Sequence, residues 1–94
     1  MAAPSDAADS PHRTRFVAEY DDERLARVVA TSLGQEVGEI DDDRSRTSLS
    51  RDGRRVELVV EAADLVALRA ASNTWLSLLG VAERTADAAE TVPF

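Results

Sequence analysis

The chain has 94 residues, with 11 basic residues against 18 acidic ones and a formal net charge of -7 at pH 7. Every basic residue is an arginine and cysteine is absent, which excludes a disulfide framework and thiolate chemistry. This length favours one domain with a small core, and the acidic balance argues against nucleic-acid binding except through a local basic patch.

The sequence shows neither a signal-peptide pattern nor an apolar run that approaches transmembrane length. We therefore expect a soluble, cytoplasmic protein. An acid-rich, lysine-free composition is typical of proteins from salt-loving archaea, because a strongly hydrated surface resists association in concentrated salt. A halophilic archaeon is the predicted source.

The first 20 residues divide into a tail and a strand. Residues 1–11 are small and polar and contain two of the three prolines, so we expect them to be disordered. Residues 12–20 alternate as a strand does. His12 is the sole histidine, and no cysteine or second histidine completes a zinc site, so we expect a surface residue and no metal.

A helix is predicted to follow this strand. Asp21 or Asp22 caps its start, it runs to about residue 33, and Gly34 stops it. Its predicted buried face consists of Leu25, Val28, Val29 and Leu33.

Residues 35–43 are predicted to form a loop that ends in Asp41, Asp42 and Asp43. Three adjacent carboxylates invite a calcium or magnesium ion, but the EF-hand spacing is absent, so a solvated acidic loop is the favoured interpretation. Residues 44–50 and 54–61 then alternate on either side of a turn at 51–53. Asp-Gly in that turn indicates a hairpin.

A long helix is predicted over residues 64–83, with Asp64 as its N-cap. The predicted buried face consists of Leu65, Leu68, Ser72, Trp75, Leu76 and Leu79. We expect residues 84–94 to be a flexible acidic tail. The order strand, helix, strand, strand, helix predicts an α+β fold over residues 12–83, with a three-stranded antiparallel sheet and two helices on one face.

The opposite side of the long helix is also apolar, and only Arg69, Asn73 and Ser77 with Gly80 form a polar strip. One interpretation is an alanine-rich helix selected for its helix propensity. The other is a helix with two packing faces, one for its own sheet and one for a partner.

The run from Glu61 to Leu79 resembles the signature of the Pcc-type small subunits of the KEOPS complex. In that family an acidic residue caps a helix that carries Leu-Arg-Ala, then Asn, then an aromatic residue and leucines. The matching positions here are Asp64, Leu68, Arg69, Ala70, Asn73, Trp75 and Leu76. The element order also agrees over residues 13–83. One departure is Gly34-Gln35-Glu36, where the family pattern has Pro-Glu.

This resemblance implies a non-catalytic scaffold without a cofactor. Family members dimerise and bind the threonylcarbamoyl-transferase subunit of a complex that installs threonylcarbamoyladenosine in tRNA. Both helices contact that subunit. The resemblance therefore assigns the partner-binding surface to Ala26, Ala30, Ala67, Ala70, Ala71, Thr74, Leu78 and Val81.

A second hypothesis is RNA contact through the outward face of the sheet. The predicted RNA-binding residues are Arg13, Arg15, Arg44, Arg46 and Arg55. The alternative is that these arginines pair across strands with Glu19, Glu57 and Glu61. Outward aromatic residues that would stack on bases are absent.

Two further alternatives remain open. The chain is either a dimeric module for another partner, or a paralogue that forms a heterodimer with the main small subunit. Catalysis by this chain is not expected, because it has no cysteine, no lysine, one histidine and no glycine-rich phosphate loop.

Overall fold

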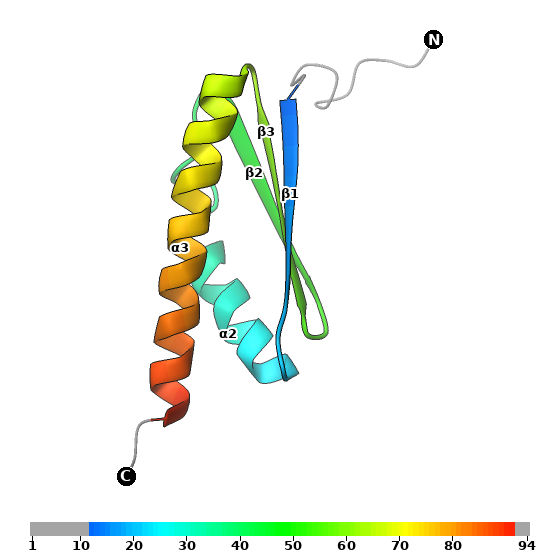
Figure 1. Cartoon of the computed structure of the whole chain (residues 1–94), viewed down its shortest axis with the longest axis vertical. Coiled ribbons are helices and arrows are strands. Elements are labelled where there is room, and N and C mark those ends of the chain that lie inside the picture. The colour runs from blue at the N-terminus through cyan, green and yellow to red at the C-terminus, as the bar shows by residue number, and fades with distance from the viewer. Residues whose placement is uncertain (1–11, 92–94) are drawn as a thin grey trace.

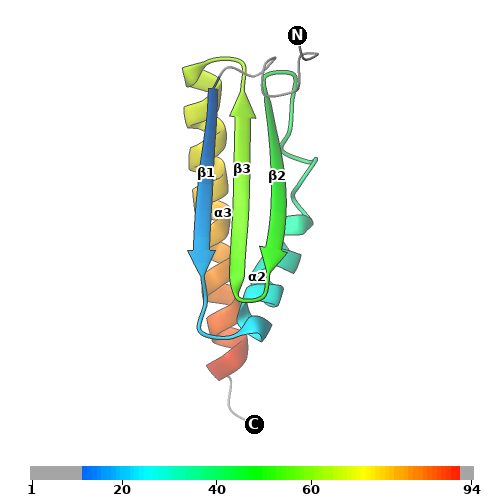
Figure 2. The ribbon, with the colours of Figure 1, turned by 90° about the vertical axis from the view of Figure 1, so that its right-hand side faces the viewer.

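The computed structural model describes residues 12–91, and side chains as far as residue 88. The described elements are β1 (His12–Glu19), α2 (Glu23–Gly34), β2 (Ser45–Asp52), β3 (Arg55–Ala62) and α3 (Leu65–Thr91). The strands form an antiparallel sheet in the order β1-β3-β2, with both helices on one face (Figures 1 and 2). The predicted α+β class is therefore confirmed. The N-terminal segment predicted to be disordered lies outside the described residues.

The hairpin is longer and tighter than predicted. Asp52 pairs with Arg55, so only Gly53 and Arg54 form the turn, where we had placed it at 51–53. Gly53 has a φ of 61°, which a residue with a Cβ rarely adopts. Strand β2 therefore extends to Asp52, two residues beyond its predicted end at residue 50. It begins at Ser45, one residue after its predicted start at Arg44.

Helix α2 begins where the sequence predicted. The Asp22 side chain accepts a hydrogen bond of 2.7 Å from the backbone N–H of Leu25, which satisfies a donor of the first turn. Gly34 is itself the last helical residue, and the Gln35 N–H donates to the Leu33 carbonyl. The prediction that Gly34 stops the helix was right to within one residue.

Helix α3 continues well past the predicted end. Its last helical residue is Thr91, so the tail expected from residue 84 is helical over most of its length, and Ala86 is buried. No glycine or proline interrupts residues 81–91, and alanine is the strongest helix former. The long alanine-rich segment was mistaken for a tail because it lacks large apolar residues.

By length and composition, α3 is also apolar enough to cross a membrane, which corrects the expectation that no such run exists. The candidate segment is Leu65–Ala88, and its most apolar stretch has a mean hydropathy of 1.3. Only 17% of that stretch is buried inside the molecule. The helix lies along the sheet (Figure 1). Its Trp75 is fully buried in the core. Much of its apolar surface is therefore not covered by its own fold.

The core lies between the sheet and the two helices. Strand β3 supplies four buried side chains because it is the central strand: Val56, Leu58, Val60 and Ala62. The helices supply Ala26, Val29, Leu33, Ala71, Trp75, Ala82 and Ala86. The buried stripe of α3 is thus narrower than predicted and built largely from alanine.

Two leucines that were assigned to the buried face of α3 are exposed. Leu65 is 57% exposed and Leu76 is 46% exposed. Each residue advances about 100° around a helix, so Leu76 lies one quarter turn from the centre of the stripe at Trp75. The three-and-four spacing could not distinguish the centre of the stripe from its margin.

Candidate functional site

An uncharged strip runs along one flank of α3. Its residues, which we call the α3 strip, are Ala67, Ala70, Thr74, Leu78 and Val81. Ala70 and Thr74 are exposed, Ala67 and Leu78 are half-buried, and Val81 is 50% exposed. All five were predicted from the sequence as partner-binding residues, and the fold places them side by side on one surface.

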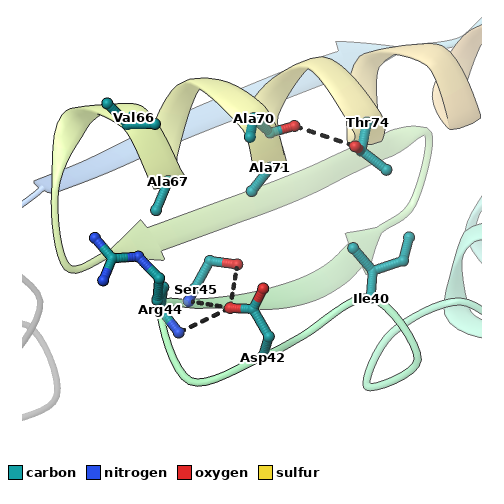
Figure 3. Close-up of a pocket in the computed structure, with 9 residues that line it drawn as sticks. All are labelled: Ile40, Asp42, Arg44, Ser45, Val66, Ala67, Ala70, Ala71 and Thr74. Atoms are coloured by element: carbon teal, nitrogen blue, oxygen red, sulfur yellow. Dashed lines mark hydrogen bonds between the residues drawn. The ribbon is translucent and has the colours of Figure 1, made fainter.

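The first half of the α3 strip lines an open groove of about 370 Å³ (Figure 3). Val66, Ala67 and Ala70 lie on the helix side, and Thr74 closes this row with its hydroxyl donating back to the Ala70 carbonyl at 3.1 Å. The facing wall is the chain before β2, with Ile40 at one end and Arg44 at the other (Figure 3). The groove therefore combines an apolar floor with one polar end.

A second, smaller groove of about 140 Å³ continues along the same flank toward the C-terminus. Leu78 and Val81 of the α3 strip line it, and they face Ser32 and Glu36 at the end of α2. Helix α2 has 12 residues and α3 has 27, so the shorter helix covers only part of this flank. The two grooves together therefore border the whole length of the α3 strip.

The polar end of the first groove is held by the start of α3. The Asp64 carboxylate accepts from the Ala67 N–H at 2.8 Å with one oxygen and forms an ion pair with the Arg44 guanidinium through the other. The Ala63 N–H donates to the Arg44 carbonyl at 2.8 Å. Arg44 therefore fixes the wall of the groove to the N-terminus of α3, instead of lying on the outward sheet face as predicted.

Two residues predicted to contact a partner are buried in the chain itself. Ala26 has no exposed surface and Ala71 is 7% exposed, and both belong to the core. Each lies next to a residue that is less buried, because neighbours along a helix point about 100° apart. Burial argues against Ala26 as a contact residue, whereas Ala71 also lines the first groove beside Ala70, so its assignment to the partner-binding surface stays a prediction. Ala30 is half-buried and packs beside the core.

The acidic loop has a structural role. Asp41 accepts from the Thr47 N–H at 2.9 Å, and Asp42 accepts from the N–H groups of Arg44 and Ser45 at 2.7 and 2.9 Å. Among the described residues no group of three His, Cys, Asp or Glu side chains is arranged to hold a metal ion. The carboxylates of Asp41 and Asp42 tie the loop to β2.

The predicted arginine face of the sheet is electrically balanced. Arg13 and Arg46 lie on either side of Glu61, whereas Arg55 lies between two acids, Glu19 and Asp52. Arg15 forms an ion pair with Glu57. This arrangement favours cross-strand pairing over a basic stripe, and RNA contact through these arginines stays a prediction.

The chain is similar to characterised proteins over most of its length. Residues 13–87 match the model of a protein family described as transcription factor Pcc1. The chain belongs to the Pcc1 family. It is 38% identical over 68 residues to the KEOPS complex subunit Pcc1 of Pyrococcus abyssi, a match that covers 72% of this chain and 83% of that protein.

The fold is similar to that of a chain in the crystal structure of a binary Gon7–Pcc1 complex. The TM-score is 0.71 at 14% identity, with 83% of this chain and 95% of that chain covered. At this identity the likeness concerns the fold alone. Pcc1 proteins are non-catalytic, so the chain is not an enzyme.

Sequence reasoning missed the residues that complete the grooves. Val66 is 79% exposed on the helix side of the first groove, and Ile40 stands on its other wall. Ile40 is the last apolar residue before three aspartates. An isolated apolar residue in a polar loop could have indicated that the loop packs against a helix at this point. Ser32 and Glu36 gave no signal, because their position depends on where α2 crosses α3.

Proposed function

We propose that this protein is the Pcc1 subunit of a KEOPS complex, in which it acts as a scaffold that binds the threonylcarbamoyl-transferase subunit. The observation that carries the proposal is the α3 strip, an uncharged surface on a chain with a net charge of -7. Family membership and the similarity to the Pyrococcus abyssi subunit support it.

The exposure of α3 supports a protein partner. A helix whose apolar window is only 17% buried within its own chain leaves apolar surface in contact with water, unless another molecule covers it. Small side chains such as Ala67, Ala70 and Thr74 let a second helix approach closely, since the distance between packed helices depends on the side chains at the contact. We therefore propose that a pair of helices from the transferase subunit binds to this flank, as the family resemblance implies.

The role in the cell follows from that of the complex. The resemblance implies formation of threonylcarbamoyladenosine in tRNA, with this subunit supplying binding surfaces and no catalytic group. We propose a cytoplasmic location, and the lysine-free acidic composition supports a halophilic source. We also propose that the protein dimerises, either with itself or with a paralogous small subunit.

A matched pair of substitutions tests the α3 strip. Thr74 and Asn73 are adjacent, exposed and polar, but only Thr74 lines the groove. We expect Thr74→Trp to weaken binding of the cognate transferase subunit at least tenfold, because a large ring fills the groove. Asn73→Trp points about 100° away and should leave the affinity unchanged.

Isothermal titration calorimetry in molar potassium chloride gives both affinities, and circular dichroism checks that each variant is folded. Equal affinities for wild type and Thr74→Trp would show that the α3 strip is not the binding surface. Equal losses in the two variants would move the contact to the polar strip of α3.

A further inference from the structure

The first groove carries one acidic side chain whose charge is not matched inside it. Its floor consists of small side chains of α3, and Ile40 and Val66 stand on opposite walls. At the polar end, the Arg44 guanidinium is neutralised by Asp64. Asp42 is the one acidic residue that lines the groove, and it forms no ion pair within the part of the chain that the structure describes.

Asp42 holds the loop with only one of its two carboxylate oxygens. Oδ1 accepts from the Arg44 N–H at 2.7 Å, from the Ser45 N–H at 2.9 Å and from the Ser45 hydroxyl at 3.5 Å. Figure 3 shows the other oxygen directed toward α3, across the groove. The hydrogen bonds that the Asp42 side chain accepts within residues 12–91 all end on Oδ1, so Oδ2 can accept from a group that enters the groove.

The occupant of the groove must match both the apolar floor and this oxygen. A partner that covers the groove removes water from Asp42, and a carboxylate that loses water without gaining a cation is strongly unfavourable. A purely apolar side chain therefore fits poorly. Lysine and arginine have an alkyl stem that lies along apolar surface and a cation at its end. Ala67 and Thr74 are about 10 Å apart along the helix axis, which is long enough for such a stem.

From these observations we propose that a lysine or arginine side chain of the transferase subunit lies along Ala67, Ala70 and Ala71 and ends at Asp42 Oδ2. The proposal rests on the proposed function, and it names the chemistry by which the groove selects its partner. It makes Asp42 a specificity-determining residue that lies on the loop before β2 and outside both helices.

A matched pair of asparagine substitutions on this loop tests the contact. Asp42→Asn keeps an oxygen that can accept from the N–H groups of Arg44 and Ser45, but it removes the charge and brings an amide donor to the groove. Asp41→Asn removes the same charge one residue away and keeps an acceptor for the Thr47 N–H. Asp41 does not line the groove. A general effect of net charge therefore changes both variants equally.

We expect Asp42→Asn to raise the dissociation constant of the complex with the transferase subunit at least about fivefold in molar potassium chloride. Asp41→Asn should stay close to wild type, because salt screens exposed charges far more than covered ones. Isothermal titration calorimetry measures both constants, and circular dichroism checks that both variants are folded. Unchanged affinity in Asp42→Asn, or an equal loss in the two variants, overturns the proposal.

A double-mutant cycle identifies the side chain on the partner. Each lysine and arginine on the contacting helices of the transferase subunit is replaced by glutamine and titrated against wild type and against Asp42→Asn. We expect one replacement to weaken binding of wild type without weakening Asp42→Asn further, since the contact is already lost there. Additive losses at every basic position would exclude a direct contact with Asp42.

Thr74→Trp separates this inference from the proposed function, because Thr74 lines the same groove. If Thr74→Trp weakens binding and Asp42→Asn does not, the transferase subunit occupies the groove without a basic side chain, and only this inference fails. If neither variant binds more weakly than wild type, the groove is not the binding surface and both fail. Losses in both variants, with Asp41→Asn unchanged, support both.

Discussion

Two adjacent alanines on α3 have different surroundings. Both line the first groove, but Ala71 is only 7% exposed and belongs to the core cluster with Trp75, whereas Ala70 is exposed. The buried stripe and the α3 strip are both uncharged and rich in small residues. The composition of this helix therefore indicates two packing surfaces. Only the position of the sheet decides which of them is internal.

The largest expected effect comes from placing the same large side chain at each of these two positions. Ala71→Trp places a large ring at a position that is almost completely buried, and we expect it to lower the free energy of unfolding by about 1–3 kcal/mol. Ala70→Trp extends into the groove and should change that free energy by no more than about 0.5 kcal/mol. Urea denaturation followed by circular dichroism measures both.

The same pair separates folding from binding. Ala70→Trp should fold normally and bind the transferase subunit weakly, because it lines the same groove as Thr74. If Ala71→Trp proved as stable as wild type, Ala71 would not be buried in the folded protein. If Ala70→Trp lost as much stability as Ala71→Trp, the α3 strip would belong to the core.

Much of the fold could be predicted from the sequence because its signals are local. Alternation located the three strands, and Asp22 and Asp64 marked the starts of both helices through caps that the structure contains. The end of α3 was mistaken because its last turns are held by alanine, with Ala82 and Ala86 buried. Alanine in a polar segment gives no pattern that separates a packed helix from a tail.

The candidate site was predictable only in part. Spacing found the α3 strip, since apolar residues opposite the main face are visible in the sequence. It could not show that Ala26 and Ala71 are buried, because the side on which α2 crosses α3 depends on tertiary packing. Nor could it place Arg44 against Asp64, a contact between segments 20 residues apart that depends on the path of the loop.

A smaller effect concerns the flank of α3 that faces β1, where a polar contact replaces apolar packing. Burial and the neighbouring Glu83 carboxylate raise the pKa of Tyr20 above its ordinary value of 10.0. Removing the hydrogen bond with Tyr20→Phe should lower the free energy of unfolding by about 1 kcal/mol near pH 7.

The pH dependence of stability tests the same contact. The unfolded tyrosine ionises near its ordinary pKa while the folded one remains protonated, so the contribution of Tyr20 to stability is constant below about pH 10 and falls as the pH rises above it. Tyr20→Phe should show a shallower fall between pH 10 and 11 in urea denaturation. Parallel curves for the two proteins would mean that Tyr20 is not protected in the folded state.

The smallest effect is expected at Gly80, which belongs to neither the buried stripe nor the α3 strip. A Cβ built there would meet only the end of the Arg84 side chain, at 3.4 Å, and this flexible guanidinium can move. Because glycine inside a helix costs conformational entropy, Gly80→Ala should raise the free energy of unfolding by about 0.5–1 kcal/mol. The affinity for the transferase subunit should be unchanged, since Gly80 lines neither groove. If Gly80→Ala were more stable but no longer bound the transferase subunit, the binding surface would be the polar strip of α3 and not the α3 strip.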